Sequence, residues 1–518
     1  MEADFSVYLP VFLHTFQYWY VILPAIVLGY VVGAIPGFSA ANTIIVLLPA
    51  TLAMGPEVGM MFMVALYASS RMGAGIPAIL VNIPGTAGAA ATPLDGYPMS
   101  QQGKGAQALA ISFTSSCIGG LLTSILVLFV IQYVVMAVYV LHSVEMIVIM
   151  LFGISLIGTI AAKEKVKGLI AGFFGLMIGS IGSDSVYAVP RGTFGFLELY
   201  DKIPLIPALV GLFAISEAFI LIERRAIMTK EGAEQMRDAK WSEVFEGIRE
   251  TFKRFWHVLW TSVIGLVIGV VPGAGAAIAA FVAYQQSQTY SKTPELYGTG
   301  HIEGLIAPES ANNGVTAGTL VPLLVLGIPG GATAAIMLVV FTYHGITVGP
   351  ELFIDKPNFA YGAFSAMAIT YIIMIFTIFP LARYMSRVTM VPTMYIIPLI
   401  ISFTLVGSFV PRAYLFDMNL AIVFGVIGYI ARKTGYHVAS ILIGVILGPL
   451  LEQYFVRALK ISQGDFWVIF SSPLGNALWI GLLISLIIPI WKEWHKNKSS
   501  RETALAKGEE AERGGTTE

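Results

Sequence analysis

Residues 300–353 read GHIEGLIAPESANNGVTAGTLVPLLVLGIPGGATAAIMLVVFTYHGITVGPELF, and this stretch decides the fold. It is apolar enough to lie in a membrane, yet residues that interrupt helices recur along it. The amides Asn312 and Asn313 lie among them. Irregular backbone at membrane depth is tolerated only where protein buries it or water reaches it. The stretch therefore predicts a binding site on interrupted helices. The interrupting residues are Pro308, Pro322, Gly327, Pro329, Gly330, Gly331 and Pro350.

The composition of the whole chain agrees with a membrane protein. Of its 518 residues, 56% are hydrophobic and only 12% are charged, and the mean hydropathy is +0.79. Since a span needs about 20 apolar residues, the apolar blocks allow about ten to fourteen membrane-embedded segments. A net charge of −1 argues against a nucleic acid partner, and a single cysteine excludes a disulfide framework or a multi-cysteine metal site.

An internal repeat divides the chain into two halves. Residues 28–41 (LGYVVGAIPGFSAA) align with residues 264–277 (IGLVIGVVPGAGAA) at an offset of 236. Residues 73–90 (GAGIPAILVNIPGTAGAA) align with residues 318–335 (GTLVPLLVLGIPGGATAA) at an offset of 245. Paired interrupted segments in corresponding halves are typical of secondary transporters, with the site at the repeat interface. The alternative interpretation is that the Pro-Gly pairs are simple kinks or hairpin turns.

These patterns predict an all-α polytopic membrane protein with two inverted repeats, Pro-Gly-broken or re-entrant helices, and C-terminal scaffold helices. The expected organisation is a first repeat half (1–222), a polar linker (223–254), a second half with scaffold helices (255–490) and a disordered tail (491–518). Because Lys and Arg are enriched in cytoplasmic loops, the linker and the tail are expected in the cytoplasm.

On the evidence of these motifs, the chain resembles the large membrane subunit of the tripartite tricarboxylate transporters, the TctA type. The resemblance covers about residues 28–353 and, more weakly, the rest. Its longest motif is EGLIAPESANN at residues 303–313. The other segments that carry it are GAIPG (33–37), VNIPGT (81–86), DGYPM (95–99), RGTFG (191–195), VPGAG (271–275) and LGIPG (326–330).

The resemblance implies a bacterial or archaeal inner-membrane symporter of carboxylates, driven by a sodium or proton gradient. It also implies two partners, a small membrane subunit and an extracytoplasmic solute-binding protein. One departure is notable. Residues 69–75 read SSRMGAG where the family usually has a Gly-rich Tyr-Gly-Gly-Ser stretch, and the added Arg71 bears on which anion is carried.

A carboxylate that leaves water needs compensation for its charge, and helix N-termini supply unpaired N–H groups and partial positive charge. The segments restarting after each Pro-Gly pair offer such ends, and Arg71 offers a planar fork, although an acidic structural partner is an equal alternative. The predicted substrate-binding residues are Ser39, Asn42, Thr43, Arg71, Asn82, Pro84, Gly85, Thr86, Gly273, Gly275, Asn312, Asn313, Pro329, Gly330 and Thr333.

A coupling ion needs its own groups. A Na⁺ ion favours carbonyl, Asn and Thr oxygens, and the predicted ligands are Asn82, Asn312, Asn313 and Thr316; the alternative is that these residues cap and bridge helices. Glu303 and Glu309 can carry a coupling proton instead, or serve as an interfacial residue and a helix-start acceptor. No cofactor other than the coupling ion and no catalytic residue is predicted.

Other classes of function remain as alternatives. An intramembrane enzyme lacks support, because the sequence has no HExxH or GxSxG motif. A passive anion channel and a carboxylate permease without a binding protein stay open. For the leading hypothesis we expect an elevator-type movement of one repeat-built domain, a homodimer through the scaffold, and membrane lipid around the apolar faces.

Overall fold

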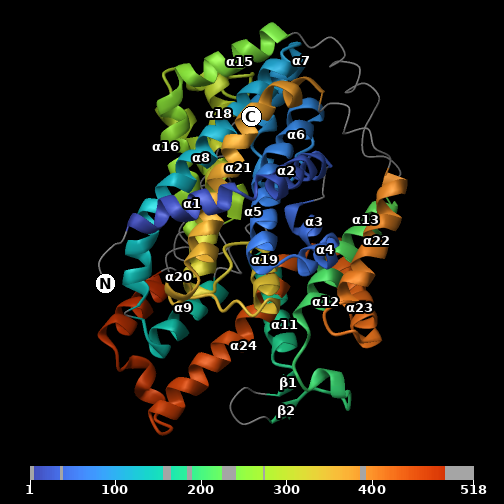
Figure 1. Ribbon diagram of the computed structural model, residues 1–518, viewed down its shortest axis with the longest axis vertical. Coiled ribbons are helices and arrows are strands. Elements are labelled where there is room, and N and C mark those ends of the chain that lie inside the picture. Colours follow the sequence, from blue (N-terminus) through green and yellow to red (C-terminus); the bar gives the residue numbers. More distant parts are fainter. Residues whose placement is uncertain are drawn as a thin grey trace, which may run out of the picture. The chain divides into compact units, whose positions relative to one another are not determined.

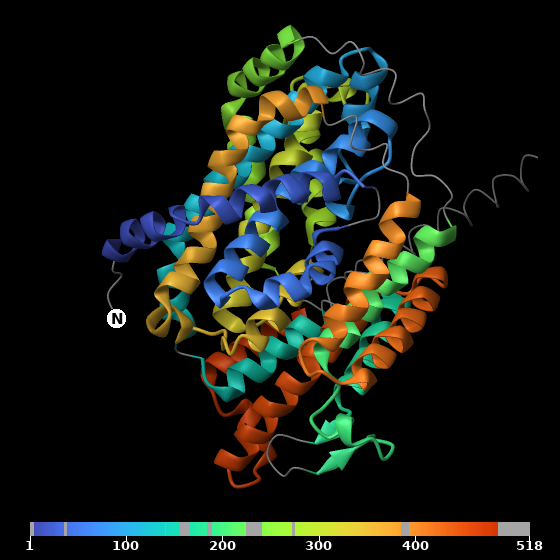
Figure 2. The ribbon, with the colours of Figure 1, turned by 45° about the vertical axis from the view of Figure 1, so that its right-hand side comes forward.

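The computed structural model describes residues 5–35, 39–139, 141–155, 165–183, 189–223, 241–271, 275–384 and 393–484. The described residues are almost entirely helical, and their one sheet is the antiparallel ribbon of β1 (Gly182–Ser183) and β2 (Pro190–Arg191), visible in Figures 1 and 2. Five helices are long and apolar enough to cross a membrane, or six if the bent pair α1–α2 forms one span. The predicted all-α polytopic membrane fold is therefore confirmed.

The chain divides into two compact units. The smaller unit comprises Leu141–Ser155 and Leu450–Glu518, and it contains α9 (Ser143–Ser155), η7 (Phe466–Phe470) and the helix at residues 473–484. Within it, the Glu145 carboxylate accepts a hydrogen bond from the His142 backbone N–H at 2.8 Å. The larger unit comprises Met1–Val140 and Leu156–Pro449 and holds every residue predicted to bind substrate or ion.

The elements of the first half run from an N-terminal bent pair to one long apolar helix. They are α1 (Tyr8–Phe16), α2 (Trp19–Gly33), α3 (Ala40–Val46), α4 (Leu48–Ala53), α5 (Pro56–Gly73), α6 (Gly75–Val81), η2 (Ala87–Ala89), α7 (Pro93–Gln101) and α8 (Gly105–Val138). Those of the second half are α15 (Trp241–Lys253), α16 (Phe255–Val270), α17 (Gly275–Tyr290), α18 (Ile302–Leu326), α19 (Ala332–Tyr343), α20 (Leu352–Asp355) and α21 (Pro357–Tyr384).

A third group of helices includes residues of the predicted scaffold, and part of it precedes the linker. Its role as a scaffold stays a prediction. It consists of α11 (Lys165–Gly179), α12 (Leu205–Leu209), the π-helical turn η4 (Val210–Ile215), α13 (Ser216–Glu223), α22 (Thr393–Phe409), α23 (Leu415–Lys433) and α24 (Val438–Ile461). Here α12, η4 and α13 pack against α22 and α23. Arg432 on α23 and Glu217 on α13 form an ion pair at 2.6 Å that joins the two halves of this group.

Matched glycines set the helix crossings in the two repeats. A Cβ atom added at Gly33 would lie 2.1 Å from the Ser70 carbonyl oxygen, and one at Gly269 would lie 2.8 Å from the Val315 carbonyl oxygen. Val315 is the residue that the 245-residue offset pairs with Ser70. The α2–α5 and α16–α18 crossings therefore use the same small residues at the same places, because only a glycine lets the backbones approach this closely.

The corresponding helices run in opposite directions. Along α5 and α18, Tyr67 bonds Thr319 at 3.2 Å and Arg71 bonds Asn312 at 2.9 Å, so one helix ascends as the other descends. The helices that follow in each half, α8 and α21, pack across the halves: α18 lies against α8, and α5 lies against α21 (Figure 1). These contacts support the predicted inversion of the repeats, which stays a prediction.

One sequence expectation about the decisive stretch is wrong. Pro308 and Pro322 were expected to interrupt the helix, but α18 continues through both and ends at Leu326. Inside a membrane bundle, neighbouring helices and Ser or Thr hydroxyls can satisfy the backbone groups that proline frees. The interruption lies at residues 327–331, where Gly327 adopts a left-handed φ of 71° and Pro329-Gly330 follow.

Candidate functional site

Arg71 lies in the last turn of α5, inside the apolar span Pro56–Leu80, and its side chain is half-buried. Its guanidinium donates hydrogen bonds to Asn312 Oδ1 at 2.9 Å and to the Tyr67 hydroxyl at 2.7 Å. The same group lies 4.9 Å from the centre of the Tyr67 ring, a cation–π distance. These partners are neutral, and the ion pairs found in the described part of the chain do not include Arg71.

Two broken segments meet at this guanidinium. Gly88 belongs to η2, which follows the Pro84-Gly85 corner, and a Cβ atom there would lie 2.1 Å from Asn312 Oδ1 and 2.8 Å from Arg71 Nη1. The same Cβ would lie 2.9 Å from Ala276, in the first turn of α17. The structure therefore brings η2, which follows the Pro84-Gly85 corner, against the start of α17 and beside Arg71.

Several buried polar atoms near these breaks have no hydrogen-bond partner. They include Asn312 Nδ2, Thr86 Oγ1 and, at the start of α3, Asn42 Oδ1. Buried polar groups in folded proteins are almost always paired, so each unpaired one calls for an explanation such as a ligand. Asn312 accepts a hydrogen bond from Arg71, and Thr86 directly precedes η2 in the chain. An anion bound beside Arg71 would give the Asn312 amide a partner.

The corners themselves are tightly held. The Gly85 backbone N–H donates to the Ala74 carbonyl at 3.2 Å, and a Cβ at Gly85 would lie 2.3 Å from the Gly33 carbonyl. Pro84, the residue before it, is half-buried. On the other side, Gly275 begins α17 with a left-handed φ of 71°. Gly273 lies outside the described residues.

The second Pro-Gly corner has different neighbours. Gly330, which follows Pro329, is buried against Thr319 of α18, and Thr333 lies in the first turn of α19. The helix α19 packs against α3 and α4, where Ser39 caps α3 by accepting from the Asn42 N–H at 3.4 Å. The Thr43 hydroxyl donates to the Ser39 carbonyl. Some of the predicted residues thus lie near Arg71 and others near α19, and only those near Arg71 include a charge.

The predicted sodium ligands do not form one cluster. Asn82 is exposed and ends α6 in a left-handed conformation with φ of 59°, at the position that Gly327 occupies in the second half. Asn313 Nδ2 donates to the Glu309 carbonyl, and Tyr371 donates to Asn313 Oδ1 at 3.2 Å and contacts Thr316 at 2.9 Å. These contacts give Asn82, Asn313 and Thr316 capping and bridging roles. Their part in sodium binding stays a prediction.

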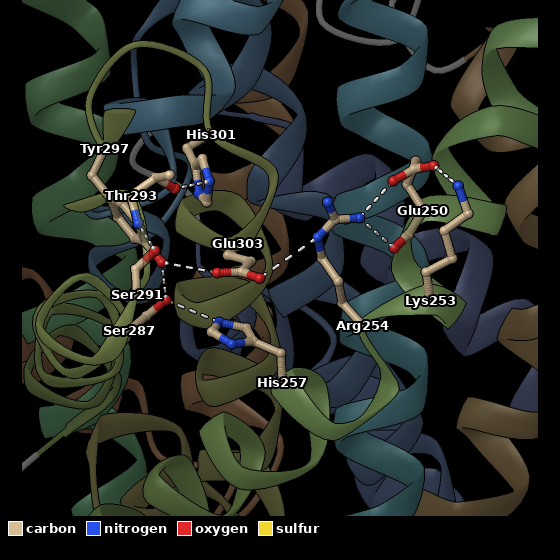
Figure 3. A network of polar contacts seen from close by, with 10 residues as sticks. All are labelled: Glu250, Lys253, Arg254, His257, Ser287, Ser291, Thr293, Tyr297, His301 and Glu303. Carbon is tan, nitrogen blue, oxygen red and sulfur yellow. Dashed lines mark hydrogen bonds and ion pairs between the residues drawn. The ribbon is translucent and has the colours of Figure 1, made fainter. Parts of the chain in front are cut away.

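A second polar network lies around the start of α18 (Figure 3). Glu303 lies 3.7 Å from Arg254 and accepts from the Tyr297 hydroxyl at 3.5 Å. Ser287 contacts both Tyr297 and His257. Lys253, the last residue of α15, and Arg254, the next residue, hold the pKa of the Glu250 carboxyl below its usual range. A cavity of about 320 Å³ borders this network and is lined by His257, Trp260, Ser287, Tyr290, Ser291 and Glu303.

The two networks differ in their unmatched charge. Arg254 in the second network already faces two carboxylates, those of Glu250 and Glu303, so an incoming anion would meet charges that are already neutralised. Arg71 offers its charge to neutral groups alone. We therefore place the candidate anion site at Arg71. Among the described residues, no group of three or more His, Cys, Asp or Glu side chains is arranged to hold a metal ion.

Sequence reasoning missed three residues of this site: Tyr67, Gly88 and Ala276. Tyr67 could have been found, since it stands one helical turn before Arg71 on the same face. Gly88 and Ala276 carry no side-chain chemistry, and their role is to let other groups approach closely. Only the packing of η2 on α17 reveals them.

Residues 20–443 match the model of the tripartite tricarboxylate transporter TctA family. The chain is 30% identical over 454 residues to an "Uncharacterized 52.8 kDa protein in TAR-I ttuC' 3'region" from Agrobacterium vitis, covering 88% of this chain and 89% of that protein. It is 34% identical over 224 residues to an "Uncharacterized protein in TAR-II ttuC' 3'region" from the same organism, covering 43% of this chain and 92% of that protein. No solved structure matches the chain.

Proposed function

The chain belongs to the tripartite tricarboxylate transporter TctA family, and from this premise we propose that it carries di- or tricarboxylate anions by secondary active symport. The family makes it a component of a tripartite transporter, which implies a solute-binding protein and a small membrane subunit as partners. It is a family of transporters rather than of enzymes.

The observation that carries the proposal is the placement of Arg71. An intramembrane charge is costly and in most cases marks a site, and this guanidinium has neutral partners at the meeting point of two broken segments. Burying a cation without a counter-charge is unfavourable. A carboxylate supplies the missing charge and matches the planar fork of the guanidinium with two parallel hydrogen bonds.

The groups around Arg71 can complete the binding of an anion. Asn312 Nδ2 and Thr86 Oγ1 are buried donors without partners, and each can donate to a carboxylate oxygen. The start of α17 adds backbone N–H groups with partial positive charge, because Ala276 lies in its first turn beside Gly88. Gly88 has no side chain to obstruct the approach.

The proposed transport movement follows from the repeats. The α2–α5 and α16–α18 crossings have the same glycine packing and carry the two Pro-Gly corners, so they form a natural moving domain. The helices α12, α13, α22 and α23 pack against one another and would form the static scaffold. An elevator-type movement of the first group along the second would expose the Arg71 site to each side in turn. Dimerisation through the scaffold is part of the same proposal.

The linker helix α15 supports the proposed orientation. Val244 and Gly247 are buried on one face of α15, whereas Phe245 and Phe252 are 58% exposed on another. An amphipathic helix with exposed aromatic side chains suits a membrane surface, where lipid would cover them. We place this surface at the cytoplasmic side of the inner membrane, together with the basic C-terminal segment.

The test is uptake into proteoliposomes that hold the permease and its small subunit, with the solute-binding protein outside and labelled citrate as the probe. We expect accumulation only when a Na⁺ or proton gradient is imposed. Equilibration without any gradient would indicate a passive anion channel, and accumulation without the binding protein would indicate an independent permease. The Arg71→Gln variant removes a charged hydrogen-bond partner worth about 1.5–3 kcal/mol, so we expect citrate uptake to fall about 10- to 100-fold.

The matched control is Arg249→Gln, which removes an exposed guanidinium from α15 outside the spans. Its uptake should equal that of the unmodified chain. Arg71→Lys should recover part of the activity, since a lysine keeps the charge but loses the fork. Unchanged uptake by Arg71→Gln would contradict the proposed site.

A further inference from the structure

Glu309 is a carboxyl group in the middle of α18 whose side chain is wholly buried. Two hydroxyls from other elements donate to it. Thr92, at the start of α7, donates to Oε1, and Ser116 of α8 donates to Oε2 at 3.0 Å. These donors come from parts of the chain that are about 200 residues away in sequence. The surroundings of this carboxyl are therefore formed by tertiary packing of separate helices.

A third hydroxyl completes the surroundings. Ser112 of α8 lies beside the Glu309 carboxyl. Its buried Oγ has no hydrogen-bond partner. A Cβ atom at Gly75, the first residue of α6, would lie 2.9 Å from Ser112 Oγ and 3.2 Å from Glu309 Oε1. The absence of a side chain at Gly75 therefore leaves room between these two groups, and the Ser112 oxygen is available to accept a hydrogen bond.

No positive group neutralises this carboxyl within the described part of the chain. Its neighbours are hydroxyls, and six charged or titratable side chains of the packed elements have partners elsewhere. These six are Arg71 on α5, Asp95 on α7, Cys117 on α8, His257 on α16, Tyr284 on α17 and Tyr371 on α21. Burying an unpaired carboxylate costs several kcal/mol after relaxation, whereas a neutral acid with three hydroxyl neighbours satisfies its hydrogen bonds.

We propose that Glu309 is the residue that takes up and releases the proton coupled to anion transport. The inference rests on the proposed function of the chain. On loading, a proton from water forms an O–H bond with one carboxylate oxygen, and on release that bond breaks and the proton returns to water on the other side. Hydroxyls suit both states of Glu309, because each can donate to the ionised carboxylate or rotate and accept from the protonated carboxyl.

The contacts favour a proton over a sodium ion. A sodium ion would need the hydroxyl oxygens to direct lone pairs at the metal. In the structure, Thr92 and Ser116 lie at hydrogen-bond distance from the two carboxylate oxygens. A third hydroxyl without a partner, that of Ser112, is what a protonated carboxyl would use as its acceptor.

The position of Glu309 also provides the coupling. It precedes Asn312 by one helical turn on α18, and Asn312 holds the Arg71 guanidinium. An ionised Glu309 repels an arriving anion, whereas a protonated Glu309 leaves the Arg71 charge to attract it. Proton binding therefore strengthens anion binding, and by linkage the anion strengthens proton binding by the same factor.

The first test needs no substrate. Infrared difference spectra of the purified full chain across neutral pH should contain the C=O stretch of a protonated carboxylic acid, and Glu309→Gln should lack it. Glu303→Gln, on the same helix but paired with Arg254, should retain it. The absence of the band in the unmodified chain, or its persistence in Glu309→Gln, would overturn the proposal.

The second test uses the complete tripartite complex in proteoliposomes with labelled citrate. One coupled proton and a pH gradient of about one unit supply about tenfold accumulation. We expect Glu309→Gln to lose this accumulation and only equilibrate citrate, while it still exchanges citrate across the membrane. Arg71→Gln should lose exchange as well. Proton-driven accumulation by Glu309→Gln would refute the coupling role of Glu309 without contradicting the Arg71 site. Retained citrate exchange by Arg71→Gln would refute the Arg71 site.

Discussion

At the crossing of α2 with α5, Gly33 lies against the Ser70 carbonyl, and at the crossing of α16 with α18, Gly269 lies against the Val315 carbonyl. The same 245-residue offset that matches these carbonyls also matches Arg71 with Thr316. The first half thus carries a guanidinium at the position where the second half carries a hydroxyl. The duplicated backbone is the shared part, and the chemistry lies in single side chains that differ between the copies.

The two side chains also differ in their surroundings. Thr316 is fully buried, and its hydroxyl contacts Tyr371 and the Asn313 carbonyl. This is a closed set of neutral hydrogen bonds. Arg71 is half-buried, and it bonds Asn312, whose Nδ2 has no partner. Thr316 therefore contributes to the packed interior of the second half, whereas Arg71 in the first half is available to bind a ligand.

The largest expected effect comes from making the second half like the first. Thr316→Arg places a charge among neutral buried groups, and an uncompensated buried charge costs about 3–5 kcal/mol. We expect this variant to unfold at much lower temperature in detergent, or to fail to accumulate in the membrane. Thr316→Ser keeps the hydroxyl and should remain near the stability of the unmodified chain.

The reverse exchange sharpens the same comparison. Arg71→Thr should unfold at a temperature close to that of the unmodified chain, because the removal of Arg71 leaves no buried carboxylate without an ion-pair partner. The same variant should bind no citrate in a direct binding measurement. If Thr316→Arg is as stable as Arg71→Thr, the two positions have equivalent surroundings and the asymmetry argued here does not exist.

A smaller effect is expected at the glycines that the halves share. Extra atoms in a packed interior cost about 1–3 kcal/mol, so Gly33→Ala and Gly269→Ala should both lower the free energy of unfolding. Gly33→Ala should do so more, since its Cβ would lie 2.1 Å from a carbonyl oxygen rather than 2.8 Å. Gly481→Ala is the control, because a Cβ there meets no atom within 4 Å. Equal and negligible effects in thermal unfolding would contradict the matched crossing.

The hydroxyls near the two Pro-Gly corners should affect binding more modestly. A neutral hydrogen bond contributes about 0.5–1.5 kcal/mol, so Thr86→Val should weaken citrate binding about 2- to 10-fold. Thr333→Val should have a smaller effect, because Thr333 is one of the predicted residues near α19, which include no charge. Titration of citrate binding to the purified complex measures both. Unchanged affinity in both variants would count against an anion held at the broken helices.

Sequence reasoning reached the repeats because their signal is local. Pro-Gly pairs and helix-packing glycines recur at a fixed offset, and close packing requires the same small residue in each copy. It reached Arg71 because a charge is conspicuous in an apolar span. It could not decide that Pro308 lies inside a continuous helix, since that depends on which neighbours satisfy the backbone. The surroundings of Glu309 were also out of reach, because Thr92 and Ser116 approach it only through tertiary packing.

The smallest expected effect lies at Asn82, where the comparison of the halves bears on the coupling ion. Asn82 and Gly327 occupy equivalent left-handed positions, and such positions favour glycine first and asparagine next. If Asn82 only ends α6, Asn82→Gly should change the free energy of unfolding by less than about 0.5 kcal/mol and leave the ion dependence of uptake unchanged, whereas Asn82→Ala should cost about 1 kcal/mol.

A sodium ligand at Asn82 predicts a different pattern. Asn82→Gly would then fold normally but require more Na⁺ for half-maximal citrate uptake, because the amide oxygen is lost while the backbone conformation is kept. Gly327→Asn is the matched variant, since it places the same amide at the equivalent corner without removing one. A Na⁺ requirement that changes in Asn82→Gly and not in Gly327→Asn would assign Asn82 to the ion, and would also argue against a proton on Glu309 as the coupling ion.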